Sequence, residues 1–233
     1  MLLGTLLKTT LSDYPGNVAT AWFLCGCNIR CPYCYNAELV VNTKAPNDAV
    51  DLQTVYRHLQ KRKNVLSGFV ISGGEALIHD ELPEIIATAK SIGYKVKLDT
   101  NGLLPEKLKN LFKKEITAPD YIAIDIKTTP EKYSLVGFTG SAHDLLSESI
   151  AIAAGLGLSN IEFRTVLVPN LVAKGDIQTM ATLLPAGAMW YFAPFQNMGC
   201  LDPLYNAMAP YGPAEMNEII NIAKQYIPKA CLR

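Results

Sequence analysis

The sequence lacks an excess of charge of either sign. Its 233 residues include 21 Lys and Arg and 21 Asp and Glu, so the formal net charge is zero. A general binder of nucleic acid or of acidic membranes carries a basic excess, so this composition argues against both functions. Charged residues make up 18% and hydrophobic residues 49% of the chain, which excludes an intrinsically disordered protein. Any partner must therefore be recognised through local features.

Long hydrophobic runs are missing as well. No apolar run approaches the roughly 18 residues that are needed to span a bilayer. The opening segment Met1–Leu7 carries neither a basic leader nor a small-residue cleavage site. We therefore expect a cytoplasmic protein with no membrane partner. In that compartment the six cysteines are expected to be reduced thiols or ligands of a metal or cluster, not disulfides.

Short apolar runs alternate with longer amphipathic stretches, a pattern typical of βα repeats. We predict strands over residues 18–24, 68–72, 95–99, 121–126, 161–168 and 189–193. We predict helices over residues 51–62, 80–91, 105–113, 142–154, 176–184 and 213–226. Six such units predict an α/β fold with a parallel sheet, either open or rolled into a barrel. We expect one domain, residues 1–233, with its chemistry at the carboxyl ends of the strands.

Three cysteines, Cys27, Cys31 and Cys34, lie close together directly after the first predicted strand. A closed structural zinc site needs four ligands, commonly in two separated pairs, and the sequence has no second Cys-x2-Cys pair. A zinc loop with Cys25 as the fourth ligand remains an alternative. An iron–sulfur cluster on three cysteines would instead leave one iron open for a substrate or cofactor, which suits an enzyme.

Polar motifs follow the next three predicted strands. These motifs are Ser72–Ala76, Asp99–Gly102 and Asp125–Lys127. Paired glycines in the first motif allow a close approach of the backbone, although a glycine pair alone indicates only a tight turn. The other two motifs could be ordinary helix caps followed by a solvated lysine. Together with Arg164 on the fifth strand, the acids and cations suit a zwitterionic ligand with hydroxyl groups.

The cysteine motif has Tyr33 directly before its last cysteine and resembles the Cys-x3-Cys-x2-Cys hallmark of the radical SAM superfamily. Within that superfamily the chain is similar to the activating enzymes of glycyl-radical enzymes. The segments that carry this resemblance are Ser12–Gly16, Gly26–Asn28, Cys31–Cys34, Gly73–Ala76, Asp99–Gly102 and Asp125–Lys127. The segment Cys200–Pro203 looks most like the activating proteins of anaerobic ribonucleoside-triphosphate reductases, with pyruvate formate-lyase activating enzymes close behind.

The resemblance implies a partial (βα)6 TIM-like barrel that binds a [4Fe-4S] cluster and S-adenosylmethionine. The cluster would lie on Cys27, Cys31 and Cys34. Reductive cleavage of S-adenosylmethionine would then place a glycyl radical on a partner enzyme, with flavodoxin or ferredoxin as the electron donor. Because the cofactors carry the reactive groups, no conventional acid, base or nucleophile is expected. The residues implied to bind the cofactor are Tyr33, Tyr35, Gly73, Gly74, Glu75, Asp99, Asn101, Asp125, Lys127, Arg164 and Gln196.

Two positions depart from the pattern of these relatives. Tyr35 stands where a histidine is usual after the third cysteine, and Phe195-Gln196 stands where relatives carry a tyrosine and a histidine. A rival interpretation is a radical SAM enzyme that acts on a small molecule, similar to the deazapurine-forming synthases. Such an enzyme would need a polar pocket, for which Asn197, Asp202 and Asn206 are the candidates.

The residues 194–212 form a long predicted loop that is rich in apolar and aromatic side chains. This composition is typical of a protein-docking surface, but it is equally compatible with packing inside the loop. We expect the loop to contribute to docking of a protein substrate. The roles of Cys25, Cys200 and Cys231 stay open at this point.

Overall fold

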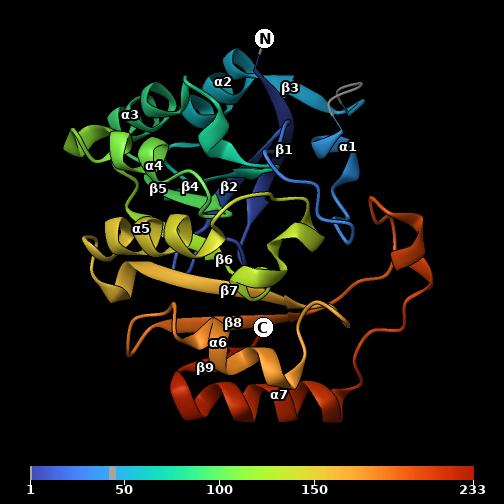
Figure 1. Cartoon of the computed structure of the whole chain (residues 1–233). Helices are drawn as coiled ribbons and strands as arrows, with labels where there is room; N and C mark the ends of the chain where they lie inside the picture. Colours follow the sequence, from blue (N-terminus) through green and yellow to red (C-terminus); the bar gives the residue numbers. More distant parts are fainter. Residues whose placement is uncertain (1, 42–45) are drawn as a thin grey trace. The chain divides into compact units, whose positions relative to one another are not determined.

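The computed structural model describes residues 2–41 and 46–233 (Figure 1). Its strands are β1 (Leu3–Thr10), β2 (Ala19–Leu24), β3 (Ala49–Asp51), β4 (Gly68–Gly73), β5 (Lys95–Thr100), β6 (Tyr121–Asp125), β7 (Ile161–Leu167), β8 (Met189–Pro194) and β9 (Ala230–Leu232). Its α-helices are α1 (Ala37–Val40), α2 (Leu52–Arg62), α3 (Leu82–Ile92), α4 (Pro105–Leu111), α5 (Ala142–Ala154), α6 (Ile177–Ala181) and α7 (Pro213–Tyr226). Short 3₁₀ helices lie at Ala76–Ile78, Glu115–Thr117, Pro130–Val136, Leu158–Asn160, Lys174–Asp176 and Pro203–Ala207.

The chain divides into two compact units. The first contains Met1–Asn28, Glu38–Thr100 and Glu106–Ile122, and the second contains Ile29–Ala37, Asn101–Pro105 and Ala123–Arg233. The prediction of one domain is not tested by this division, because a single domain can contain two such units.

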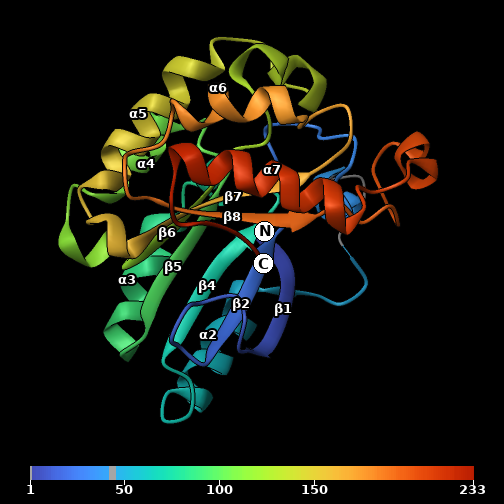
Figure 2. The ribbon, with the colours of Figure 1, turned by 90° about the horizontal axis from the view of Figure 1, so that it is seen from below.

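In the first unit, β2, β4 and β5 form a parallel sheet, and β1 pairs antiparallel with both β2 and β3 (Figure 2). The core of β4 consists of Phe69, Val70 and Ile71, all buried, as expected for a parallel strand that is covered on both faces. Helix α2 contacts β1 and α3, and α3 contacts β5. The side chain of Asp51 caps α2 by accepting a hydrogen bond from the backbone N–H of Thr54 at 2.8 Å.

In the second unit, β7, β8 and β9 are parallel neighbours. Trp190 and Phe192 of β8 are fully buried, with their ring centroids 4.5 Å apart. The indole N–H of Trp190 donates to the Thr165 hydroxyl at 2.9 Å, so this buried polar atom is satisfied. Helix α7 packs against α6 and β9. Its first residue is Pro213, as predicted for a first helical turn.

All six predicted strands and all six predicted helices are present, with ends shifted by at most a few residues. The parallel arrangement is confirmed for β2, β4 and β5 and for β7, β8 and β9. The sheet is nevertheless mixed, because β1 runs antiparallel to both of its neighbours, β2 and β3. The periodicity did not predict β1, β3 or β9. β1 is only partly buried and β3 and β9 have three residues each, so none of them has a clear apolar pattern.

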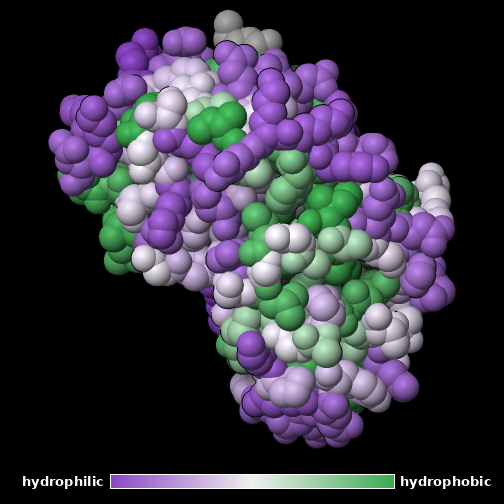
Figure 3. All heavy atoms as spheres, turned by 90° about the vertical axis from the view of Figure 1, so that its left-hand side faces the viewer, coloured by the Kyte–Doolittle hydropathy of each residue, from purple (hydrophilic) through white to green (hydrophobic). Residues whose placement is uncertain are grey.

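Figure 3 views the molecule from the side at which β7 and β8 begin in Figure 1. On this face hydrophobic side chains form patches that are bordered by hydrophilic side chains. The carboxyl ends of β7 and β8, where parallel sheets usually bind ligands, point away from this face. Among the described residues, no helix combines the length and the apolar character that a bilayer crossing requires.

Candidate active site

The ends of β2 and β4 approach each other through glycines in the first unit. Gly73 has a φ of +127°, and a Cβ added to it would lie 2.3 Å from the carbonyl oxygen of Leu24. A Cβ on Gly74 would lie 2.0 Å from the carbonyl oxygen of Gly26. No other residue type fits at such distances, so the close approach expected of this glycine pair is present. The contact fixes the backbone directly before Cys27.

Glu75, directly after the two glycines, is held through both its backbone and its side chain. Its backbone N–H donates to the carbonyl oxygen of Gly26 at 2.8 Å. Its buried carboxylate accepts hydrogen bonds at Oε1 from the backbone N–H of Leu77 at 3.0 Å and from the hydroxyl of Thr100 at 2.9 Å. A buried carboxylate needs such donors, so the orientation of Glu75 is set by the first unit itself.

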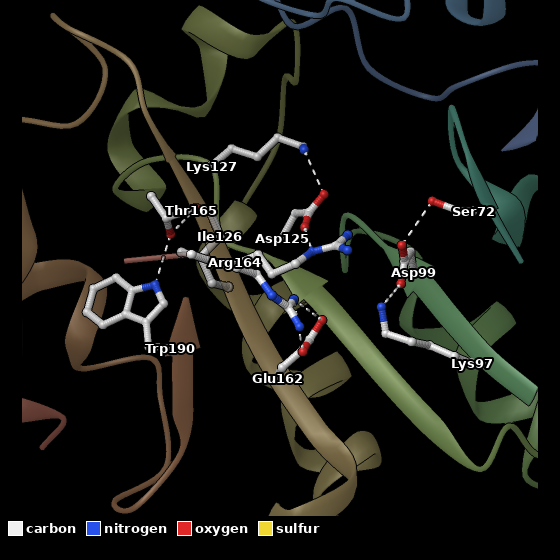
Figure 4. Close-up of polar contacts among 11 residues, drawn as sticks. Ser72, Lys97, Asp99, Asp125, Ile126, Lys127, Glu162, Arg164, Thr165 and Trp190 are labelled. Carbon is white, nitrogen blue, oxygen red and sulfur yellow. Dashed lines mark hydrogen bonds and ion pairs between the residues drawn. The ribbon is translucent and has the colours of Figure 1, made fainter. Parts of the chain in front are cut away.

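Asp99 lies near the end of β5 and is contacted by two side chains of the first unit (Figure 4). The ammonium of Lys97 donates to Oδ1 at 2.7 Å, and the hydroxyl of Ser72 donates to Oδ2 at 3.0 Å. Lys97 is 1% exposed and the side chain of Asp99 is 10% exposed. Sequence reasoning treated Lys97 as an ordinary strand residue and did not predict this buried ion pair.

His79 contacts the backbone close to the cysteine motif. Its ring is half-buried, and Nε2 lies 3.0 Å from the carbonyl oxygen of Cys25. Burial lowers the pKa of His79, although the bond to Cys25 opposes the shift. A neutral ring with its proton on Nε2 donates to this carbonyl and so holds the backbone two residues before Cys27.

The cysteine loop continues into the second unit as a turn. The backbone N–H of Cys34 donates to the carbonyl oxygen of Cys31 at 3.1 Å and closes that turn. Tyr33 is buried inside it, and burial raises the pKa of its phenol well above the ordinary value. Burial also raises the pKa of the Cys34 thiol, while the backbone N–H of Asn36 and the nearby Lys127 oppose the shift.

The loop 194–212 holds this cysteine turn from the other side. The backbone N–H of Leu201 donates to the carbonyl oxygen of Cys34, and that of Asp202 donates to the carbonyl oxygen of Pro32, both at 2.9 Å. Cys200, directly before these two residues, is buried, and its thiol lies 3.6 Å from the carbonyl oxygen of Gln196. The resemblance of Cys200–Pro203 to known activating proteins was the only sequence signal for this contact.

Three of the predicted site residues lie together in the second unit: Asp125 at the end of β6, Lys127 just beyond it, and Arg164 in the middle of β7 (Figure 4). Arg164 donates through Nε to Oδ1 of Asp125 at 2.7 Å, and Nζ of Lys127 lies 3.3 Å from Oδ2. Burial alone would lower the pKa of Lys127, but the charge of Asp125 together with the nearby Tyr33, Cys31 and Tyr133 raises the pKa well above its ordinary value. The alternative of a solvated Lys127 is wrong, since its side chain is 16% exposed.

Tyr133 supports this group and was not predicted from the sequence. It is fully buried, and its hydroxyl accepts a hydrogen bond from the backbone N–H of Lys127 at 3.2 Å. Burial raises the pKa of Tyr133 to about 12, so the phenol is neutral. The ring of Phe138 packs edge-on against it, with the centroids 6.4 Å apart. Tyr133 thereby fixes the backbone from which Lys127 extends.

Three further predicted residues have different surroundings. Asn101 is buried, and its Oδ1 accepts a hydrogen bond from the backbone N–H of Leu103 at 3.1 Å, as in a local turn. Tyr35 is 59% exposed. Gln196 lies in the loop 194–212, where its carbonyl oxygen faces the thiol of Cys200.

All six cysteines are free thiols. Among the described residues, no group of three or more His, Cys, Asp and Glu side chains is arranged to hold a metal ion, which leaves both the cluster ligands and the zinc alternative with Cys25 as predictions. Cys27 belongs to the first unit, and Cys31 and Cys34 belong to the second. Reduced thiols of this spacing are the donor set that an iron–sulfur cluster requires, so the residues present fit such a group.

A comparison with protein families decides the class of this protein. Residues 23–183 match the model of the radical SAM superfamily, which is more than half of the chain. The chain belongs to the radical SAM superfamily. The cofactors of this superfamily are a [4Fe-4S] cluster and S-adenosylmethionine, as the cysteine motif predicts.

Individual relatives are similar to this chain beyond the residues that match the family model. A protein of Methanocaldococcus jannaschii, provisionally named as a glycyl-radical enzyme activating enzyme, is 28% identical over 236 residues, covering 100% of this chain and 95% of its own. The pyruvate formate-lyase-activating enzyme of Streptococcus mutans is 28% identical over 176 residues, covering 70% and 64%. The crystal structure of QueE from Escherichia coli is similar with a TM-score of 0.59 at 15% identity, covering 100% and 93%. That last likeness concerns the fold, which is the α/β fold of radical SAM enzymes.

Proposed function

We propose that this radical SAM enzyme activates a glycyl-radical enzyme by generating a radical on a glycine of that partner protein. The observation that carries the proposal is the likeness to the M. jannaschii protein, which extends over the whole of this chain. The partner we propose is an anaerobic ribonucleoside-triphosphate reductase, because Cys200–Pro203 resembles the proteins that activate it. Pyruvate formate-lyase or another glycyl-radical enzyme is the alternative partner. Flavodoxin or ferredoxin is the proposed electron donor.

Three thiolates are the proposed cluster ligands, those of Cys27, Cys31 and Cys34. The glycine contact with Gly26 supports the first ligand, and the turn held by the loop 194–212 supports the third. Cys25 is not included, since it lies outside the Cys-x3-Cys-x2-Cys motif and its carbonyl oxygen lies 3.0 Å from Nε2 of His79. When bound, the cluster and S-adenosylmethionine supply the one-electron chemistry that removes a hydrogen atom from the substrate.

The charged groups at the strand ends are proposed to bind S-adenosylmethionine. Lys127 is held protonated by Asp125 and supplies a cation for the carboxylate of the cofactor. Asp99 and Glu75 supply oriented carboxylates that accept hydrogen bonds from its amine and its hydroxyl groups. The further residues that we assign to this site are Tyr33, Tyr35, Gly73, Gly74, Asn101, Arg164 and Gln196.

The loop 194–212 gives a reason to prefer a protein substrate over a small molecule. The three polar candidates for a small-molecule pocket all bond to the backbone of the loop itself. Nδ2 of Asn197 donates to the carbonyl of Met208, Oδ1 of Asp202 accepts from Leu204, and Oδ1 of Asn206 accepts from Cys200. These contacts stabilise the loop, so the three side chains are not directed to a separate ligand.

The test is anaerobic incubation of the reconstituted protein with S-adenosylmethionine, a reductant and the purified candidate reductase. We expect a glycyl doublet in the electron paramagnetic resonance spectrum, together with the release of methionine and 5′-deoxyadenosine. The matched control is the reductase with its radical-bearing glycine replaced by alanine. Replacing the chemical reductant with flavodoxin or ferredoxin identifies the electron donor.

Two results would contradict the proposal. Cleavage of S-adenosylmethionine without a doublet on the reductase or on pyruvate formate-lyase would favour a small-molecule substrate. Failure to bind the cofactor at all after the cluster is assembled would contradict the assignment of the charged residues.

A further inference from the structure

Lys97 is a lysine in the interior of the first unit, and the proposed chemistry gives it no role. It is 1% exposed and lies on β5, two residues before Asp99. An ammonium group is not buried in a protein interior unless it is paired, because the loss of its hydration is very costly. Of β5, the proposed function uses Asp99 as an acceptor, and Thr100 holds the carboxylate of Glu75. The buried lysine therefore needs an explanation of its own.

The geometry of β5 directs Lys97 toward Asp99. Residues i and i+2 of a strand point to the same face, so the two side chains lie next to each other on one side of the sheet. Nζ of Lys97 lies 2.7 Å from Oδ1 of Asp99, which is the length of a charge-assisted hydrogen bond. Nζ also lies 5.9 Å from the ring centroid of Tyr121, at the outer limit of a cation–π contact.

Ser72 engages the second oxygen of the same carboxylate. The register of β4 and β5 pairs Ile71 with Leu98, so Ser72 and Asp99 are the next neighbours along the two strands. The Ser72 hydroxyl donates to Oδ2 at 3.0 Å, while Lys97 engages Oδ1 (Figure 4). Both oxygens of Asp99 are thus held from within the first unit, and the carboxylate cannot rotate without losing one of these bonds.

We propose that Lys97 is a positioning residue that keeps Asp99 oriented for the hydrogen-bond donors of S-adenosylmethionine, with Ser72 as its weaker counterpart. This inference rests on the proposed function, in which Asp99 contacts the cofactor. The bond from Lys97 is charge-assisted and the bond from the Ser72 hydroxyl is not, so Lys97 should hold the carboxylate of Asp99 more firmly than Ser72 does. Lys97 acts through Asp99 and does not contact the cofactor itself.

The experiment is a double-mutant cycle on the holoenzyme with its cluster assembled. Lys97→Met removes the charge while keeping a long apolar side chain, and Asp99→Asn removes the charge of its partner. We measure the dissociation constant of S-adenosylmethionine by anaerobic equilibrium dialysis, and KM and kcat for its reductive cleavage. Lys97→Met should raise the dissociation constant and KM roughly tenfold to a hundredfold, with kcat largely unchanged. Iron and sulfide content should equal that of the wild type.

The double variant separates positioning from a general structural effect. If Lys97 acts only through Asp99, adding Lys97→Met to Asp99→Asn should not weaken binding further. Lys90→Met is the matched control, because Lys90 also pairs with an acid of the first unit, Asp120, at 3.1 Å and is largely buried. This control should bind the cofactor like the wild type. If Lys97→Met fails to fold, Ser72→Ala provides the same test, with an expected loss of about twofold to tenfold that vanishes in the Asp99→Asn background.

The outcomes distinguish this inference from the proposed function. Weak binding by Asp99→Asn with wild-type binding by both Lys97→Met and Ser72→Ala would overturn the positioning role alone. Equal losses for Lys97→Met in the wild-type and Asp99→Asn backgrounds would show that Lys97 acts independently of Asp99. Wild-type binding of S-adenosylmethionine by Asp99→Asn would instead show that Asp99 does not belong to the cofactor site. The positioning role of Lys97 would then be wrong as well.

Discussion

The glycine turn of the first unit and the cysteine turn of the second unit are held in different ways. The glycine turn is fixed where two regular strands end, and its backbone atoms approach so closely that a Cβ on Gly74 would lie 2.0 Å from a carbonyl oxygen. The cysteine turn is fixed by two backbone hydrogen bonds from the loop 194–212, whose regular structure is a single 3₁₀ helix over Pro203–Ala207. One turn is stabilised by sheet geometry and the other by a distant loop.

This difference predicts different responses to change. A contact between strand ends cannot relax without moving the sheet, so the glycine turn should tolerate no added atom. Hydrogen bonds from a loop can break one at a time, so the cysteine turn should loosen gradually. The proposed function requires that a segment of a partner protein enter the site, and an adjustable loop beside the third cysteine suits that requirement.

The largest effect is expected from replacing the three cysteines of the motif, because their thiols are the proposed ligands of the cluster. Cys27→Ala, Cys31→Ala and Cys34→Ala should each abolish assembly of the cluster, because two thiolates cannot hold it with one open iron. Cys25→Ala and Cys231→Ala should retain it. Iron and sulfide analysis after anaerobic reconstitution measures the result. Loss of the cluster in Cys25→Ala, as complete as in Cys31→Ala, would show that the ligand assignment is wrong.

The second prediction tests the rigidity of the glycine turn. Gly74→Ala should lower the free energy of unfolding of the cluster-free protein by about 3 kcal/mol, since the new Cβ clashes with backbone and not with a movable side chain. Gly175→Ala is the control, because a Cβ there meets nothing within 4 Å, and it should change stability by less than about 0.5 kcal/mol. Urea denaturation followed by circular dichroism measures both. Equal stability of the two variants would contradict the argument.

The same comparison explains which parts of the site the sequence could predict. Gly73 and Gly74 were identifiable because glycine is the residue type that close backbone contact demands. Asp99, Asp125 and Lys127 were identifiable because they follow apolar runs that have the length and composition of strands. Each of these signals is local, within a few residues of the feature that it predicts.

The residues that sequence reasoning missed depend on contacts distant in sequence. Residues 95–99 were predicted only as a strand, and nothing in that pattern indicates that Lys97 is buried beside Asp99. The ring of His79 lies within hydrogen-bonding distance of the carbonyl oxygen of Cys25. The hydroxyl of Tyr133 accepts a hydrogen bond from the backbone N–H of Lys127. No periodicity encodes such pairings, which only the folded chain brings together.

The third prediction concerns the outward side of the loop 194–212. Packing inside the loop is the correct interpretation for Phe195, which is buried with its ring 6.3 Å from that of Tyr205. Met198 and Leu204 are 75% and 77% exposed and form the apolar surface that we propose for docking.

Met198→Ser and Leu204→Ser should therefore lower the yield of glycyl radical about fivefold to tenfold each, while cleavage of S-adenosylmethionine is spared. Val65→Ser is the control, because Val65 is an exposed apolar residue of the first unit, at 61%. Radical yield by electron paramagnetic resonance is compared with 5′-deoxyadenosine formed in the same samples. Proportional loss of both would show that the loop serves the cofactor site instead of docking.

The smallest effect is expected from loosening the loop that holds the cysteine turn. Oδ1 of Asn206 accepts a hydrogen bond from the backbone N–H of Cys200 at 3.0 Å, directly before the residues that bond to the turn. Asn206→Ala removes that acceptor, which costs about 1 kcal/mol of local stability and should speed removal of the cluster by a chelator about fivefold. The change should leave assembly of the cluster intact, in contrast to the loss of a thiol.

Asn160→Ala is the matched control for this last prediction. Asn160 is also exposed and also bonds through its side chain to a backbone group, the carbonyl of Leu156 at 3.0 Å, but it lies outside the loop. Its variant should release iron at the wild-type rate, as followed by the absorbance of an iron–chelator complex. If Asn206→Ala and Asn160→Ala release iron equally fast, the loop does not stabilise the cysteine turn, and the two turns are not held as differently as the backbone contacts indicate.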